Sequence, residues 1–141
     1  MKHVMTTMLC MAWLAGAGTG AAQAVAQAKP PLREVKEIDD NMLWVAIAHE
    51  ISEDCDEIAP RTIKGLTYLL SLKRKAQQLG YTNQEIEDYH KSDVEKARIR
   101  AKGEQYVESK GLDPENAADL CTLGHAEIAR NSMIGIFLRA K

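Results

Sequence analysis

Apolar residues recur every three or four positions along most of the chain, which is the spacing of one face of an α-helix. The first such segment runs from Ile38 to Ile51, and Asp39 or Asp40 is available as its N-cap. Four acidic residues crowd its far end and oppose the helix dipole, so we expect this helix to end near Cys55. No segment alternates with period two over enough residues to predict a strand.

A second helix is predicted between Pro60, a favourable first-turn residue, and Gly80, a favourable residue just beyond a helix end. Its large apolar residues keep the three-and-four spacing of a helix face: Ile63, Leu66, Leu69 and Leu70. Because only a short connection joins it to the first helix, we expect the two to be antiparallel neighbours.

Two capping boxes mark further helix starts. The first runs from Thr82 to Glu85, and the second runs from Ser92 to Glu95. The stretch 85–91 is therefore either a short helix followed by a new one or the first part of a kinked helix.

The last third of the chain predicts one more helix and a final apolar segment. The preceding helix should end at Gly111, after which Asp113 is a candidate N-cap with Pro114 in the first turn. Asn131 can break this helix, and the apolar run 133–138 then belongs either to the core or to an exposed anchor for a partner. We favour the core, because a small domain with few aromatic residues needs its large apolar side chains inside.

Together these elements predict an all-α fold. We expect a small single-domain bundle of four or five helices over residues 38–141, with one disulfide. An extended N-terminal arm at residues 27–37 precedes it, because Pro30 and Pro31 restrict the backbone there. The length of 141 residues is suitable for one domain.

The first residues have a different composition from the rest. One charge, Lys2, precedes a short apolar run and then a series of small residues, which is the order found in secretory signal peptides. We expect residues 1–26 to be the signal peptide, with cleavage after Ala24 or Ala26, and export to the periplasm by the general secretory route. An uncleaved anchor is the alternative, but the apolar run is shorter than the roughly 20 residues that span a membrane. We therefore expect no membrane span after cleavage.

Signal cleavage also changes the cysteine count, because Cys10 is removed and Cys55 and Cys121 remain. Two cysteines in an oxidising compartment predict a Cys55–Cys121 disulfide. It would close a loop of 66 positions and stabilise the fold by about 4 kcal/mol. A redox-active or metal-binding pair is the alternative, but the two residues form no C-x-x-C motif.

The charge distribution excludes some partners and suggests others. The formal charge of −2, and of −3 after removal of residues 1–26, argues against a nucleic-acid-binding protein. Residues 34–57 contain nine acids and one lysine, whereas residues 58–84 contain five basic residues and no acid. We interpret this as opposite charges that meet between two adjacent helices; the alternative is a basic face for an anionic partner.

Some histidines have the spacing of metal ligands. His49 and Glu53 lie four positions apart on one helix face, but the H-E-x-x-H motif is incomplete. His125 lies one turn after Cys121. If Cys121 forms a disulfide, its thiolate is not available as a metal ligand beside His125. We interpret His49 as a solvated side chain beside acids, and keep a small-ligand or metal-binding protein that uses His49, Glu53 or His125 as the alternative function.

No catalytic or cofactor motif occurs in the chain. The phosphate-binding loop, the C-x-x-C-H haem signature and the G-x-S-x-G elbow are all missing from the sequence. We therefore expect no catalytic, cofactor-binding or metal site. The main hypothesis is a non-enzymatic interaction or structural module of the cell envelope, with an unknown protein partner.

Several short segments also resemble one known family. They are Pro30-Pro31-Leu32-Arg33-Glu34-Val35, Glu37-Ile38-Asp39-Asp40, Leu79-Gly80-Tyr81-Thr82, Glu85-Ile86-Glu87, Glu95-Lys96-Ala97-Arg98 and Ala126-Glu127-Ile128-Ala129-Arg130. In this order they resemble a family of small exported alphaproteobacterial proteins, the domain of unknown function 5333, over Pro30 to Lys141. Cys55 and Cys121 fall where the two cysteines of that family lie. The resemblance implies an exported bacterial protein and brings no activity, ligand or catalytic residue.

Overall fold

A computed structural model describes residues 28–141 of the chain. In this part the α-helices are α1 (Lys36–Asp54), α2 (Thr62–Gln78), α3 (Asn83–Lys91), α4 (Asp93–Glu108) and α5 (Ala117–Ala129). Two 3-10 turns, η1 (Leu32–Glu34) and η2 (Gly135–Phe137), and two strands, β1 (Ile58–Pro60) and β2 (Leu138–Ala140), complete the elements. The predicted signal peptide, residues 1–26, lies outside the described residues. Within the segment predicted as an extended arm, η1 forms and α1 begins at Lys36.

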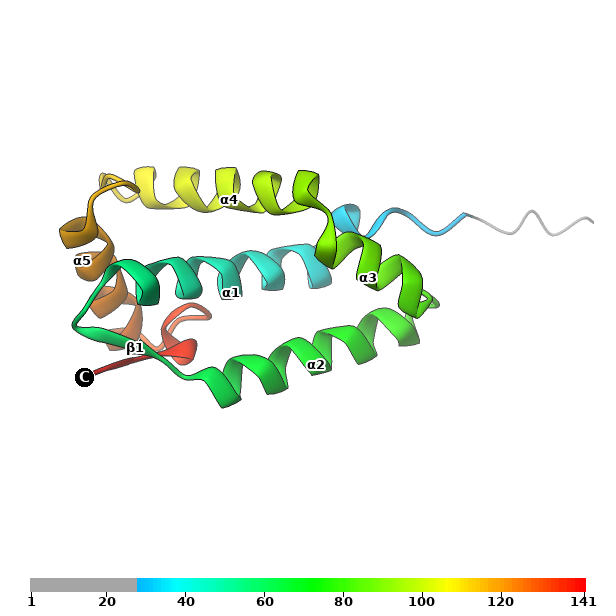
Figure 1. Cartoon of the computed structure of the whole chain (residues 1–141), viewed down its shortest axis with the longest axis horizontal. Helices are drawn as coiled ribbons and strands as arrows, with labels where there is room; N and C mark the ends of the chain where they lie inside the picture. The colour runs from blue at the N-terminus through cyan, green and yellow to red at the C-terminus, as the bar shows by residue number, and fades with distance from the viewer. Residues whose placement is uncertain (1–27) are drawn as a thin grey trace, which may run out of the picture.

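Helix α1 is the centre of the molecule (Figure 1). In the view of Figure 1, α4 runs along one side of it, α2 along the other, and α5 crosses near its C-terminal end. The buried face of α1 includes Leu43, Ile47 and Ile51, which share one core with Leu120 and Leu123 of α5. This arrangement confirms the predicted all-α bundle of helices.

A two-stranded antiparallel sheet is present that the sequence pattern did not predict. Ile58 is opposite Ala140, and Pro60 is opposite Leu138. Each strand has three residues, which is too short to show an alternating pattern. The pairing depends instead on side chains from distant parts of the chain, since Ile58 and Leu138 are both fully buried.

The C-terminal apolar segment belongs to the core, as predicted. Ile134, Phe137 and Leu138 are buried, and the chain turns into this segment at Asn131, which has a positive φ of 50°. Turn η2 packs tightly against α5: a Cβ added to Gly135 would lie 1.9 Å from the Glu127 carbonyl oxygen. Only glycine therefore fits at this position of the turn.

The disulfide prediction is confirmed. Cys55 follows the last residue of α1 and is bonded to Cys121 in α5, with their Cα atoms 5.1 Å apart. The bond joins the C-terminal end of the central helix to the crossing helix, and Cys55 itself is buried.

The local signals for helix ends are confirmed in the middle of the chain. Thr82 and Glu85 form the reciprocal hydrogen bonds of a capping box at the start of α3. The Ser92 side chain accepts a hydrogen bond from the Glu95 amide, so α4 is a new helix and not the continuation of α3. Gly80 has a positive φ of 89° just beyond α2, as expected for a glycine at this position.

Two predicted helix starts are wrong. Pro60 lies in β1, and α2 begins two residues later at Thr62, because the backbone before it pairs with the C-terminal strand. Pro114 lies in a turn before α5; the N-cap is Asn116, whose side chain accepts hydrogen bonds from the amides of Ala118 and Asp119.

The predicted cap of the first helix is also wrong. Val35 precedes α1, and neither Asp39 nor Asp40 caps it. Asp39 lies one turn inside the helix and is almost fully buried. Its carboxylate instead accepts hydrogen bonds from side chains of α3 and α4.

Candidate functional site

A groove with mostly apolar walls lies between α2 and α3, beside the first turns of α1. Its volume is about 380 Å³. We call it the α2–α3 groove and define it by the residues that line it: Leu32, Ile38, Met42, Leu66, Leu69, Leu70, Leu72, Lys73, Ala76, Asn83, Ile86, Glu87, Tyr89, His90 and Lys91.

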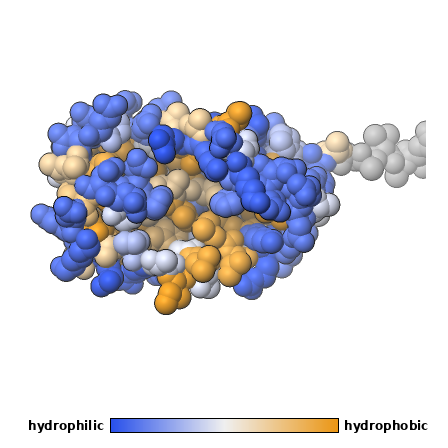
Figure 2. Space-filling view, viewed as in Figure 1, coloured by the Kyte–Doolittle hydropathy of each residue, from blue (hydrophilic) through white to orange (hydrophobic). Residues whose placement is uncertain are grey.

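The α2 wall of this groove continues into an exposed apolar face. Ile63 is 84% exposed, Leu66 is 59% exposed and Leu70 is 49% exposed. These positions are three and four residues apart, so they lie along one side of the helix. Figure 2 shows hydrophobic residues gathered on the face of the molecule that carries α2. Contiguous apolar surface beside a groove is a feature of binding sites, whereas single exposed apolar residues are ordinary.

Helix α2 exposes this face because few of its residues are needed for the core. Leu72 and Ala76 are its buried residues. Its start and middle are attached by specific contacts: the Arg61 amide donates to the Phe137 carbonyl oxygen at 2.6 Å, and the Tyr68 hydroxyl donates to Asn41 Oδ1 at 2.6 Å. The helix is therefore fixed in place while its outer apolar side chains stay exposed.

The two walls of the groove differ in charge. Helix α2 carries basic residues and no acid, and its Lys73 lines the groove. On α3, Glu87 accepts a hydrogen bond from Lys91, and this contact lowers the pKa of the Glu87 carboxyl group. The predicted pairing of acids on the first helix with bases on the second is confirmed by Lys75 and Glu37, whose charged atoms are 2.7 Å apart.

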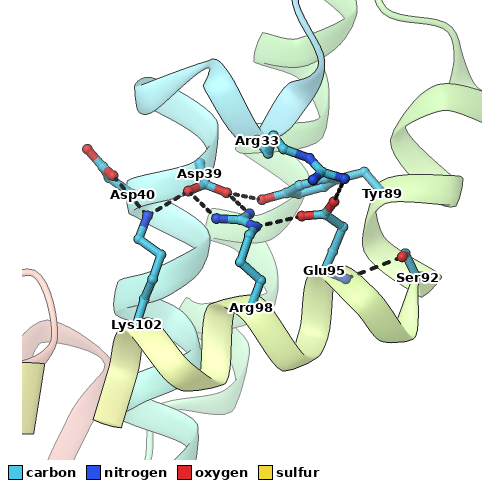
Figure 3. A network of polar contacts seen from close by, with 8 residues as sticks. All are labelled: Arg33, Asp39, Asp40, Tyr89, Ser92, Glu95, Arg98 and Lys102. Atoms are coloured by element: carbon cyan, nitrogen blue, oxygen red, sulfur yellow. Dashed lines mark hydrogen bonds and ion pairs between the residues drawn. The ribbon is translucent and has the colours of Figure 1, made fainter. Parts of the chain in front are cut away.

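A buried network of polar contacts holds the α3 wall to the rest of the protein (Figure 3). At its centre is Asp39 of α1, whose side chain is only 3% exposed. It accepts hydrogen bonds from the Tyr89 hydroxyl at 2.7 Å, from Lys102 Nζ at 2.8 Å and from the Arg98 guanidinium group. Figure 3 shows these side chains converging from α1, α3 and α4.

The network extends to the N-terminal arm through Glu95. Its carboxylate accepts from Arg98 Nε at 2.8 Å and forms an ion pair with Arg33. Since Leu32 and Tyr89 both line the groove, the same network fixes the arm and the α3 wall.

The pKa values in the network follow from these contacts. Burial alone would raise the pKa of Asp39, but hydrogen bonds from Arg98, Lys102 and Tyr89 outweigh it and lower the value from 3.8 to about 2. Burial, together with the hydrogen bond to Asp39, raises the pKa of the Tyr89 hydroxyl group. Asp39 is therefore ionised and Tyr89 is a neutral donor at neutral pH.

A second buried carboxylate has a similar role at the other end of the bundle. Glu127 of α5 is fully buried and accepts hydrogen bonds from Tyr106, Arg130 and Ser132. Burial would raise the pKa of Glu127, but these hydrogen bonds lower it overall. This cluster stabilises the turn that leads into the C-terminal segment.

A further cleft of about 480 Å³ lies between α1, α4 and the start of α5. It is lined by charged residues of both signs, among them Glu50, Asp54, Lys96 and Arg100. Because its charges are mixed, this cleft shows no clear preference for an anionic, a cationic or an apolar ligand. The α2–α3 groove is therefore the better candidate site.

The histidines that the sequence suggested as ligands are not brought together into a metal site. His49 Nδ1 is 3.9 Å from Glu53 Oε1 on the exposed side of α1, as the helical spacing predicts. His125 Nε2 is 3.0 Å from Glu57 Oε2. Among residues 28–141, no group of three or more histidines, cysteines or acids is placed to hold a metal ion.

The chain matches the Family of unknown function (DUF5333) over residues 30–139, which is well over half of its length. The protein belongs to this family. The resemblance to the domain of unknown function 5333 is therefore confirmed. No curated protein and no solved structure shows significant similarity to the chain. Within residues 28–141, none of the helices combines the length and the hydropathy that a bilayer-crossing segment requires.

Two features of this DUF5333 chain were missed by the sequence analysis. The cap signal points to Asp39 or Asp40, although Asp39 lies four and eight positions before Leu43 and Ile47 and so shares their apolar face. An acid on a core-facing stripe is a signal of a buried ion pair. The exposed face of α2 was also missed. The spacing of apolar residues shows which of them share a side of the helix, but it does not show whether that side is covered by the rest of the protein.

Proposed function

We propose that this protein is an exported helical module of the cell envelope, not an enzyme, and that it binds a segment of a partner protein in the α2–α3 groove. The observation that carries this proposal is the exposed apolar face of α2 beside the groove. Ile63, Leu66 and Leu70 lie on one side of the helix, and two of them line the groove.

The energetics support a partner at this face. Full burial of a leucine or isoleucine side chain contributes about 1.5–3 kcal/mol. Three such side chains on one helix face, together with Ile86 on the opposite wall, can supply a large part of the free energy of a moderate complex.

Export is supported by two independent features. The first residues of the chain have the charge and apolar pattern of a secretory signal peptide. The Cys55–Cys121 disulfide suits an oxidising compartment such as the periplasm, where such bonds persist.

Site-directed photo-crosslinking in the cells that make the protein tests the proposal. A benzoylphenylalanine residue in place of Leu66 should give a discrete crosslinked product in the periplasmic extract. Adding Leu70→Glu should remove this product, because a charge in the groove prevents an apolar segment from docking.

Val94 offers a matched control, since it is an apolar helical residue that is 69% exposed and lies outside the groove. The same photoreactive residue at position 94 should give no discrete product. Equal products from positions 66 and 94, or no product from position 66, would contradict the proposal.

A further inference from the structure

We infer that the segment bound by the α2–α3 groove is an amphipathic helix with acidic residues along the edge that faces α2; this inference rests on the proposed function. Helical ligands of apolar grooves insert anchor residues spaced three, four and seven positions apart. The groove offers complementary apolar contacts on two walls, Leu66 and Leu70 of α2 and Ile86 of α3.

The positive charge of the α2 wall is the reason to expect acidic residues on the edge of the bound helix that faces it. Lys73, which lines the groove, and Arg74, which lies just outside it, are three and four positions after Leu70 and continue the exposed apolar face by one turn. Both are exposed, and neither forms an ion pair within the described part of the chain. Residues 58–84 contain no acid that could neutralise them locally.

The α3 wall does not offer the same attraction. Its Glu87 is paired with Lys91 and is also close enough to Lys73 of α2 for that lysine to help lower the pKa of the Glu87 carboxyl group. The positive charge available to a ligand is therefore concentrated on α2, which defines one edge of the bound helix.

The same charges argue against a second copy of this chain as the occupant. In a symmetric antiparallel contact centred on Leu66 and Leu70, Lys73 and Arg74 of each copy would face the N-terminal half of the other copy's α2, which carries Lys64 and no acid. Like charges directly opposite each other in an interface oppose its formation.

An anionic bilayer also fits this surface less well than a helix. The apolar surface includes the inside of a groove, where Met42 and Ile86 are reached by inserted side chains and not by a flat surface. Its α3 wall adds little attraction for an anionic bilayer, because Lys91 there is paired with Glu87.

Binding of synthetic peptides to the purified, oxidised protein tests the inference. Three fluorescent amphipathic helices of about 18 residues share one apolar face and carry glutamate, glutamine or lysine along its edges. We expect the glutamate peptide to bind roughly tenfold more tightly than the glutamine peptide, and the lysine peptide most weakly. Raising the ionic strength should reduce the difference, because salt screens exposed charges.

Charge reversal in the protein should reverse this order. The variant Lys73→Glu/Arg74→Glu should prefer the lysine peptide, whereas Lys96→Glu/Arg100→Glu, a matched pair of changes on α4 outside the groove, should keep the preference of the unchanged protein. Both variants alter exposed residues, and circular dichroism checks that they are folded.

The outcomes separate the two proposals. Equal binding of all three peptides, sensitive to Leu70→Glu, would overturn the acidic edge and leave the groove as a docking site. No binding of any peptide would overturn the inference, and the crosslink from position 66 then decides separately whether the groove is a docking site. If the protein bound phosphatidylglycerol vesicles and none of the peptides, the occupant of this surface would be a membrane and not a helix, and the inference would also be overturned.

Discussion

Asp39 connects several elements of this protein, whereas a helix cap acts within a single helix. It lies on α1 and binds side chains of α3 and α4, and through Arg98 it reaches Glu95 and the arm. A buried carboxylate with several charged donors is ionised and contributes stability only while those donors are present. The residue therefore fixes the geometry of the α3 wall without touching a ligand.

We predict that Asp39→Asn lowers the free energy of unfolding by about 2–3 kcal/mol near pH 7, because Arg98 and Lys102 lose their buried partner. The pKa of Asp39 is about 2 in the folded protein, compared with the ordinary value of 3.8 that applies to the unfolded chain. Ionisation of a group with a lowered pKa stabilises the fold above the unfolded value, and this stabilisation is lost as the pH falls towards the folded value. The difference between the variant and the unchanged protein should therefore shrink between about pH 4 and pH 2, as measured by urea unfolding.

The neighbouring Asp40 supplies the control. It is half-exposed, and its carboxylate lies 3.8 Å from Lys102 Nζ. Asp40→Asn should change the free energy of unfolding by less than about 0.5 kcal/mol, as is usual for exposed pairs. Equal effects of the two substitutions would contradict the role given to Asp39.

At the scale of the elements, the disulfide is the covalent link between α1 and α5. The double variant Cys55→Ala/Cys121→Ala should lose about 4 kcal/mol of stability, because the unfolded chain gains the conformational freedom of a long loop. Urea unfolding measures the loss, and the unchanged protein under reducing conditions should give a similar curve. Two free thiols in the protein isolated from cells without reductant would contradict the bond.

The elements also show which parts of the fold a sequence can predict. The starts of α3 and α4 were predicted, because each cap and the amide that it binds lie within four residues. The full capping box forms at α3 but not at α4, where the Glu95 carboxylate binds Arg98 and Arg33 instead. The start of α2 was not predicted, because it depends on the pairing of β1 with a strand almost eighty residues later. A helix cap leaves a local pattern in the sequence, whereas the pairing of two three-residue strands leaves none.

The same distinction applies to the candidate site. The sequence identified the basic character of α2 and paired the two cysteines correctly. It did not show that Leu66 and Leu70 remain exposed, because this depends on the position of α2 relative to α1 and α3. The groove is a property of packing, so it became visible only with the fold.

At the scale of the whole molecule, the bundle is braced at both of its ends. The disulfide and the buried Glu127 hold the end that contains α5, while Asp39 holds α3 and α4 to α1. Helix α2 is attached at its start through Arg61, whose Nε donates to the Leu138 carbonyl oxygen at 3.0 Å. A rigid frame around an exposed apolar surface loses little conformational entropy on binding, which favours a docking function.

The most direct test of this account is a map of backbone amide shifts by nuclear magnetic resonance, recorded as the acidic amphipathic peptide is added to the labelled protein. The account predicts that the largest shifts occur at Leu66, Leu70 and Ile86, with little change at Ile99 and Gly103 in the cleft beside α4. Shifts concentrated in that cleft, or no shifts at saturating peptide, would contradict the assignment of the α2–α3 groove as the binding site.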